Sequence, residues 1–197
     1  MRIFVAVEDD LSLAFARRLI AEQPTLEIFR EKVCGGFGAL KRDIRKFDNM
    51  AKNGVPVFLI TDLDNGRCPS QLTLEWLGSM PHPSLVFRVA VREIEAWLLA
   101  HPDPIAREFK ISTTEFGQFP DDITDPKAML LRLAGRAPRN IRVGMQPKPG
   151  STARIGPEYN AILSELVAAD WDPKIASLRS PSLARARKSL QRLAQCS

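Results

Sequence analysis

Three short apolar runs in the first half of the chain each end in acidic residues. The runs span residues 3–7, 55–61 and 85–91, and the acids that follow them are Glu8, Asp62, Asp64, Glu93 and Glu95. Short runs rich in Val, Ile and Phe and bounded by turn residues are typical of strands buried on both faces of a sheet. In an open parallel sheet, ligands gather at the edge where the carboxyl ends of the strands meet. The pattern therefore predicts a parallel sheet with carboxylates converging on one edge.

The order of predicted elements indicates an α/β fold. Amphipathic helices are expected over 11–22, 39–52 and 70–78, and a further strand is expected over 26–33. Alternating strands and helices predict a mostly parallel central sheet of about four strands, flanked by helices and joined by right-handed crossovers. Residues 34–38, which are rich in glycine, predict a tight turn before the second helix.

The pattern changes after residue 101. A stretch studded with proline leads into predicted helices over 127–133, 159–168, 173–178 and 182–194. We expect residues 1–101 to form the α/β core. Residues 102–197 are expected to form a basic helical elaboration packed on it, so that the chain makes one structural domain.

The acidic strand ends predict a divalent metal site. Clustered carboxylates repel one another unless protons or cations neutralise them, and ligands that are all oxygen favour Mg²⁺, Mn²⁺ or Ca²⁺ over zinc. Asp62 and Asp64 can bind one cation together, and the Asn65-Gly66 pair that follows them is typical of a tight turn. The simpler alternative is an Asx-turn in which an aspartate caps the next helix. Glu8 continues the first strand to the same edge, and we expect Asp10 to cap the following helix.

Glu93 and Glu95 are ambiguous because their backbone conformation decides which of them faces the site. In a strand both side chains share a face, whereas in a helix they lie on nearly opposite sides. Either could support a second ion, and either could simply complement the dipole of a helix in its first turn.

Charge is distributed unevenly along the chain. Residues 127–197 hold 13 Lys and Arg against 4 Asp and Glu, whereas residues 1–126 hold 15 against 19. A basic part beside an acidic edge suits a cation-dependent site that acts on a polyanion such as nucleic acid. The basic candidates are Arg139, Arg142, Lys148 and Arg154, with Lys148 as a candidate for neutralising a phosphoryl charge. The alternative is that these residues only solvate helix faces.

Other sequence features narrow the class of protein. Cys34, Cys68 and Cys196 are widely spaced and odd in number, so neither a disulfide framework nor a zinc knuckle is indicated, and a reducing cytoplasm fits best. No apolar stretch approaches the roughly 20 residues that a membrane helix needs, so no membrane association is expected. His82 and His101 both neighbour prolines and are expected in exposed turns.

A glutamate that ends the first strand, followed by an Asp-x-Asp motif that ends the third, resembles the Toprim domain. More closely, the chain resembles a bacterial family of small Toprim-like proteins of unknown function, related to the nuclease part of overcoming-lysogenization-defect proteins. The resemblance rests on Val7-Glu8, on Leu59 to Asp64 and on Val89 to Ala100, with a weaker similarity at Ser180 to Leu183.

This resemblance implies that Glu8, Asp62 and Asp64 bind Mg²⁺ or Mn²⁺ and that Glu93 or Glu95 supports a second ion. It further implies metal-dependent cleavage of phosphodiesters in DNA or RNA, with an AAA-type ATPase as a partner in phage defence or DNA processing. Many Toprim domains have glycine after the first glutamate, whereas this chain has Asp9, so a catalytically inactive binding module is the alternative.

Two other families share parts of the pattern. The start of the chain, from Val7 to Leu19, is similar to a receiver domain, in which Asp62 or Asp64 would accept a phosphoryl group. The Met-Pro pair and the later lysine that receivers carry are missing. The segment from Asp62 to Gly66 also resembles a haloacid-dehalogenase motif, but there the motif ends the first strand and a threonine or serine stands in place of Gly66.

Overall fold

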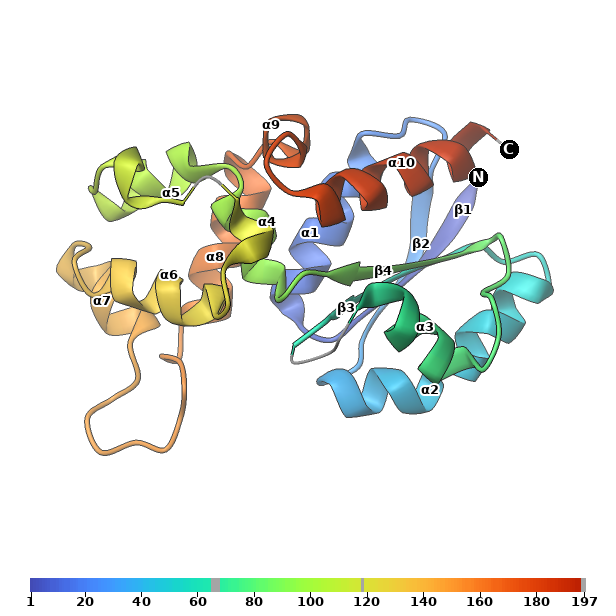
Figure 1. Ribbon diagram of the computed structural model, residues 1–197, viewed down its shortest axis with the longest axis horizontal. Helices are drawn as coiled ribbons and strands as arrows, with labels where there is room; N and C mark the ends of the chain where they lie inside the picture. Colours follow the sequence, from blue (N-terminus) through green and yellow to red (C-terminus); the bar gives the residue numbers. More distant parts are fainter. Residues whose placement is uncertain (65–67, 118, 196–197) are drawn as a thin grey trace.

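A four-stranded sheet lies at the centre of the molecule. The computed structural model describes residues 1–64, 68–117 and 119–195. The strands run in the order β2-β1-β3-β4, and every neighbouring pair is parallel (Figure 1). Their bounds are β1 (Arg2–Val7), β2 (Glu27–Val33), β3 (Val57–Asp62) and β4 (Leu85–Ala90). The predicted α/β class is confirmed, and the three strands that end in acidic residues are direct neighbours.

Helices cover both faces of this sheet. Helices α1 (Asp10–Ala21) and α10 (Pro181–Gln195) lie on one face, and α2 (Phe37–Lys52) and α3 (Pro69–Leu77) lie on the other (Figure 1). Side chains of β1 alternate accordingly, because Val5 packs into the core beneath α1 while Phe4 packs into the core beneath α2. Burial on both faces explains why β1, β3 and β4 are almost continuously apolar, whereas the edge strand β2 carries charged residues and none of its residues is buried.

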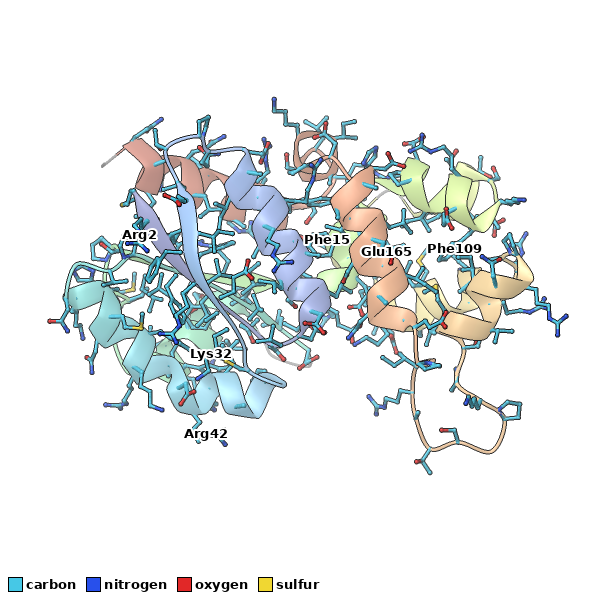
Figure 2. The ribbon with its side chains drawn as sticks, turned by 180° about the vertical axis from the view of Figure 1, so that it is seen from behind. Arg2, Phe15, Lys32, Arg42, Phe109 and Glu165 are labelled. Atoms are coloured by element: carbon cyan, nitrogen blue, oxygen red, sulfur yellow. The ribbon has the colours of Figure 1, made fainter. Side chains whose placement is uncertain are left out.

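A second group of helices lies beyond the carboxyl ends of the strands (Figure 1). It consists of α4 (Ile94–Leu99), α5 (Pro102–Phe109), α6 (Pro126–Ala134), α7 (Arg139–Met145), α8 (Tyr159–Ala169) and α9 (Pro173–Ser177). Two short 3₁₀ helices, η1 (Thr113–Glu115) and η2 (Pro120–Asp122), lie between α5 and α6 in the chain. Helix α8 packs along α1, and the two lie side by side when the molecule is seen from behind (Figure 2).

The helical part shares one apolar core with the sheet. Phe15 of α1 meets the rings of Trp97 and Trp171 edge to face, with centroid distances of 6.1 and 4.7 Å. The Trp171 indole donates a hydrogen bond to the Trp97 carbonyl at 3.1 Å, and all three side chains are fully buried. Residues 102–197 are thus joined to residues 1–101 by a continuous core, which also contains Leu183 and Leu190 of α10.

Several local expectations are wrong or lie outside the described residues. Asp9, and not Asp10, caps α1, because its side chain accepts a hydrogen bond from the Ser12 amide at 2.8 Å. His101 is buried at 7% exposure and accepts a hydrogen bond from the Asp172 amide at 3.0 Å. The turn chemistry expected from Asn65 and Gly66 lies outside the described residues.

Candidate metal centre at the carboxyl edge of the sheet

The glycine turn after β2 fixes the backbone at Glu8. The amides of Gly35 and Gly36 both donate hydrogen bonds to the Glu8 carbonyl at 2.9 Å. Both glycines have positive φ values, 81° and 112°, which residues with a side chain rarely adopt. Asp9, directly after Glu8, is the N-cap residue of α1. Glu8 is therefore held between the end of β1, the start of α1 and the turn that leads into α2.

Glu8 and Asp62 are held together at the ends of neighbouring strands. Glu8 Oε1 accepts one hydrogen bond from the Thr61 hydroxyl at 2.5 Å and another from the Asp62 amide at 3.0 Å. Both donors belong to β3, so the side chain of Glu8 crosses from β1 to the end of the adjacent strand. A carboxylate with one oxygen fixed in this way is pre-oriented for a ligand at its other oxygen.

The side chain of Asp62 is fixed by the next loop. Asp62 Oδ1 accepts a hydrogen bond from the Ile94 amide, at the start of α4, at 2.8 Å. The amides of Leu63 and Asp64 both donate to the Arg92 carbonyl at 2.9 Å, which ties the segment after β3 to the segment after β4. The hydrogen bonds found among the described residues thus engage Glu8 Oε1 and Asp62 Oδ1, and none of them engages the second oxygen of either carboxylate.

Asp64 lies at the exposed rim of this group. Its φ of 48° places its backbone in the left-handed region, which aspartate tolerates better than most residues. Its charge contributes to raising the pKa of the Glu8 carboxyl, after the larger effect of burial. The predicted carboxylates Glu8, Asp62 and Asp64 thus lie at one edge, which we call the acidic edge.

Glu93 and Glu95 both face Lys127, the second residue of α6. Lys127 Nζ lies 3.4 Å from Glu95 Oε1 and 3.9 Å from Glu93 Oε1, and the Lys127 amide donates to Glu93 Oε2 at 3.0 Å. Glu93 is the extended N-cap residue of α4 and Glu95 lies in its first turn, so the two side chains need not follow helical spacing.

Glu95 is the most deeply buried glutamate of the group. It is 2% exposed, and its Oε1 accepts a hydrogen bond from the Tyr159 hydroxyl at 3.0 Å. Glu95 Oε2 is buried and has no hydrogen-bond partner among the described residues. Lys127 and Tyr159 occupy one oxygen of this side chain and leave the other unsatisfied.

Burial and mutual repulsion raise the pKa of the carboxyls in this region. Burial raises the pKa of Asp62 well above its usual value, and the charges of Glu95 and Glu8 raise it further. Burial also raises the pKa of Glu8 and of Glu95. For Lys127, burial alone would lower the pKa, but the charges of Glu95, Glu93 and Asp62 outweigh it and raise the pKa. The carboxylates of the site therefore carry more negative charge than Lys127 alone neutralises.

The chemistry of the donors fits a hard divalent cation. The acidic edge offers carboxylate oxygens alone, the ligand type of Mg²⁺ and Mn²⁺. Within the described ranges, however, no three His, Cys, Asp or Glu side chains are arranged closely enough to hold an ion. Glu8 and Asp62, each with one oxygen held by a backbone amide, would hold the ion, with Asp64 at the rim. The unpartnered Glu95 Oε2 is a further donor of the same type.

The basic candidates lie away from these carboxylates. Arg139 and Arg142 are exposed on α7, and Lys148 and Arg154 are exposed in the long loop between α7 and α8 that projects from the helical part (Figure 1). Among the described residues, Lys148 makes no hydrogen bond or ion pair with the acidic edge. The lysine that lies beside the two glutamates at the start of α4 is Lys127, which the sequence pattern indicates only as the start of a helix.

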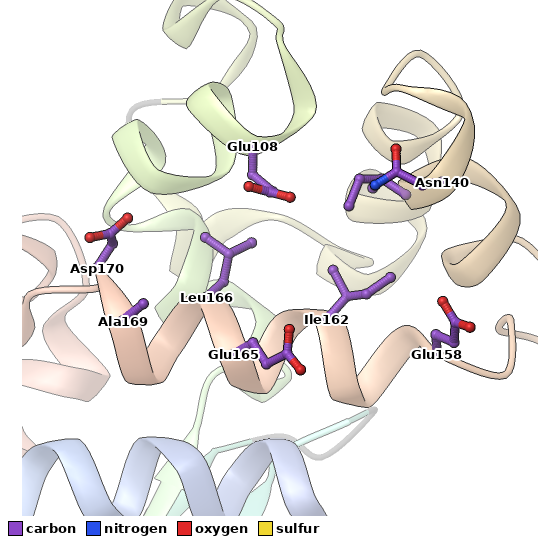
Figure 3. Close-up of a pocket in the computed structure, with 9 residues that line it drawn as sticks. Glu108, Asn140, Glu158, Ile162, Glu165, Leu166, Ala169 and Asp170 are labelled. Carbon is purple, nitrogen blue, oxygen red and sulfur yellow. The ribbon is translucent and has the colours of Figure 1, made fainter.

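A separate acidic cavity lies within the helical part. It has a volume of about 330 Å³ and is lined by carboxylates from α5, α8 and the residues that flank α8 (Figure 3), namely Glu108, Glu158, Glu165 and Asp170. None of its described lining residues belongs to the acidic edge. Carboxylates in this number repel an anionic ligand, so we do not assign the cavity a part in phosphate chemistry.

No family model, curated protein or solved structure matches the chain at significant similarity. The resemblance to Toprim-like proteins therefore stays a prediction, while the α/β fold with its four parallel strands is in keeping with it. None of the described helices has the length and apolar character needed to cross a membrane.

Proposed function

We propose that the protein is a Mg²⁺- or Mn²⁺-dependent phosphodiesterase that acts on DNA or RNA at the acidic edge. One observation carries the proposal. Glu8, directly after β1, is held by the Thr61 hydroxyl and the Asp62 amide, and Asp62 at the end of β3 is held by the Ile94 amide, so two carboxylates that repel each other are fixed at neighbouring strand ends. Like charges held close together cost stability unless a proton or a cation neutralises them, and the carboxylate oxygens that no hydrogen bond engages support a cation here.

Each side chain has a distinct part in this proposal. Glu8 and Asp62 would bind the ion through the oxygens that the backbone amides leave free, with water molecules completing its coordination and Asp64 lying at the rim. The ion itself supplies Lewis-acid activation of a phosphoryl oxygen and lowers the pKa of a water nucleophile. Lys127, with Glu93 and Glu95 around it, keeps a fixed positive charge beside the site.

The exposed arginines and lysine of α7 and the following loop support a polyanionic substrate. Arg139, Arg142, Lys148 and Arg154 make no ion pair among the described residues, so their charges are available to phosphate groups. A role for an AAA-type ATPase partner and a cytoplasmic location belong to the same proposal and rest on the sequence alone.

A binding module without catalysis is the second candidate. It is favoured by Glu93 and Glu95, because internal partners already engage both side chains. In that case the acidic residues near α4 serve to join the sheet to the helical part, and only the binding of nucleic acid or of a partner remains.

The test compares Asp62→Asn with the native protein. The amide oxygen that this substitution introduces can still accept the hydrogen bond from Ile94, so the fold is expected to persist while metal binding and cleavage of plasmid DNA or RNA are lost. Asp122→Asn, at an exposed position without an ion pair among the described residues, is the matched control. Calorimetry with Mn²⁺ shows whether the acidic edge binds an ion, and the cleavage assay separates the two candidates.

Cleavage by Asp62→Asn at the native rate would refute the proposed site. Native protein that binds Mn²⁺ at this edge but cleaves neither DNA nor RNA would favour the binding module. Lys127→Met and Lys148→Ala, compared in the same assay, decide which lysine assists: we expect the first to reduce cleavage at saturating substrate and the second to weaken substrate binding.

A further inference from the structure

A groove at the outer edge of β4 is lined by residues of α3, β4 and α10 and of the turn between α3 and β4. In the ribbon, α3 and α10 lie on either side of this edge strand (Figure 1). The volume of the groove is about 470 Å³, and its described lining residues include Leu74, Met80, Phe87, Arg88, Ser182 and Arg185. We call it the edge groove. It lies along the side of the sheet, whereas the acidic edge lies at the ends of the strands, so it is distinct from the proposed metal centre.

One wall of the edge groove carries positive charge without a counterion. Arg88 Nε is buried and has no hydrogen-bond partner among the described residues. Arg185 and Arg192 of α10 are its charged neighbours, and burial together with these two charges lowers the pKa of Arg88. Arg185 and Arg192 are two helical turns apart and so lie on the same side of the helix. No acidic residue is among the described residues that line the groove.

The other wall is apolar and exposed. Leu74 of α3 is 54% exposed, and Met80, in the turn that leads to β4, is 85% exposed. An exposed leucine and methionine beside a strand edge form an apolar contact surface next to the cationic one.

The floor of the groove is the open backbone edge of β4. The Ser84 carbonyl accepts from the Val57 amide and the Ala90 carbonyl accepts from the Leu63 amide, so even-numbered residues turn their peptide groups toward β3. In a parallel strand the intervening residues turn theirs the other way. Phe87 and Val89 therefore direct their peptide groups into the groove, where no hydrogen bond to them is found among the described residues.

We propose that the edge groove binds an extended segment of a partner protein in which acidic side chains alternate with apolar ones. A strand added beside β4 would send alternate side chains to opposite faces of the sheet. One set meets Arg88 and Arg185 on the α10 side, and the other meets Leu74 and Met80 on the α3 side. Because one wall is cationic and the other is apolar, the partner segment has to alternate acidic and apolar side chains.

Other occupants fit the groove less well. A second copy of this chain paired through the same edge would bring Arg88 and Arg185 against their own counterparts, which repel. A nucleic-acid strand would satisfy the arginines but leave the apolar wall and the peptide groups of Phe87 and Val89 without partners.

The test pans a library of random dodecapeptides, displayed on phage, against the native protein and against Arg185→Glu. Native protein is expected to enrich peptides with alternating acidic and apolar residues, and Arg185→Glu is expected to lose this enrichment. A labelled peptide from the selection is then titrated by fluorescence anisotropy. We expect Arg185→Glu to weaken its Kd by about tenfold or more, which corresponds to about 1.4 kcal/mol.

Two further variants keep the test decisive. Met80→Glu changes a side chain that is too exposed to affect folding, and it should also weaken the binding of the peptide. Arg45→Glu, on α2, reverses an exposed charge elsewhere and should leave binding of the peptide unchanged. A proline placed at the centre of the peptide should abolish binding, because it removes a backbone donor.

Several results would overturn the proposal. One is the enrichment of peptides without acidic residues, and another is equal affinity of the selected peptide for the native protein and for Arg185→Glu. A third is dimerisation of the native protein that Arg185→Glu abolishes. The last is binding of a short single strand of DNA that Arg185→Glu impairs while no peptide is enriched. Cleavage activity does not enter these readouts, so a failure here is distinguishable from a failure of the nuclease proposal.

Discussion

At the scale of single residues, Lys127 is the position that the structure adds to the predicted site. Its ammonium group lies 3.9 Å from Glu93 and 3.4 Å from Glu95, yet it is remote from both of them in the sequence. No local pattern distinguishes it from the other basic residues of the second half of the chain. The only signal is its place at the start of a predicted helix that follows Pro126, and that signal does not indicate a partner.

Removal of Lys127 tests how far the protein depends on this ion pair. Lys127→Met leaves Glu95 buried without a counterion, so we expect it to lower the free energy of unfolding by about 3 kcal/mol. The double variant Lys127→Met/Glu95→Gln should recover part of this loss, because the buried charge is removed as well. Urea unfolding followed by circular dichroism measures both. A single variant as stable as the native protein would show that Glu95 is already protonated.

At the scale of elements, apolar runs and helical spacing predict the strands and the long helices. The predicted ends differ from those in the structure by one or two residues. The sequence pattern does not predict helices α5 and α7, because Pro102 and Pro104 in the first and Gly144 in the second are typical of loops. Proline is tolerated in the first turn of a helix, where its missing amide has no partner within the helix. The tight turn predicted at residues 34–38 is shorter in the structure, because it lies at Gly35 and Gly36 and α2 already begins at Phe37.

The glycine turn before α2 gives a prediction at the same scale. Gly36 is the N-cap residue of α2 with φ 112° and ψ 170°, a conformation open almost only to glycine. Gly36→Ala should therefore cost about 1–3 kcal/mol of stability and displace the Glu8 carbonyl that the turn holds. Gly38→Ala, inside α2 with open space at its Cα, is the matched control and should stabilise by about 0.5–1 kcal/mol. Thermal unfolding of both variants provides the comparison.

At the scale of the whole molecule, residues 1–101 and 102–197 form one body, because a helix of the second part covers the sheet of the first. Helix α10 packs on β4 and α1, and Arg187 of α10 makes two hydrogen bonds with the carboxylate of Glu22, at 2.8 and 2.7 Å. We therefore expect a fragment of residues 1–101 to lack cooperative unfolding and to expose apolar surface. Dye binding and heat capacity measurements would show this, and a fragment that unfolds cooperatively would contradict it.

A point variant in α10 tests, in the full chain, how far this helix stabilises the shared core. Leu190 is fully buried in the shared core, so Leu190→Ala should cost about 2–5 kcal/mol. Leu178, 86% exposed, is the matched control, and Leu178→Ala should be close to neutral. Chemical denaturation of both variants measures the difference. Equal effects of the two would mean that α10 contributes little to the core.

The raised pKa values of Asp62 and Glu95 predict how stability depends on pH. Because the folded protein binds these protons more tightly than the unfolded chain does, stability of the metal-free protein should fall as pH rises from about 4 through the raised values. Measurements between about pH 5 and 8 with a chelator avoid Asp43, whose pKa is lowered to about 2 by Lys32 and Lys46. Asp62→Asn should flatten the dependence, and Mn²⁺ should restore stability most strongly at the higher pH. His101, whose pKa burial lowers, contributes a rise of stability with pH in this range in both proteins, so an equal pH dependence of the native protein and Asp62→Asn would contradict the prediction.

The class of the fold, the approximate positions of the four strands and the convergence of Glu8, Asp62 and Asp64 on one edge are predictable from the chain before it folds. These features follow from local periodicity and from the rule that parallel strands end together. The contacts of Lys127 and Tyr159 with Glu95, the separation of Lys148 from the acidic edge and the place of Arg88 in the edge groove become visible only once the chain is folded. Such contacts join residues distant in the chain, and they depend on packing that no local pattern records.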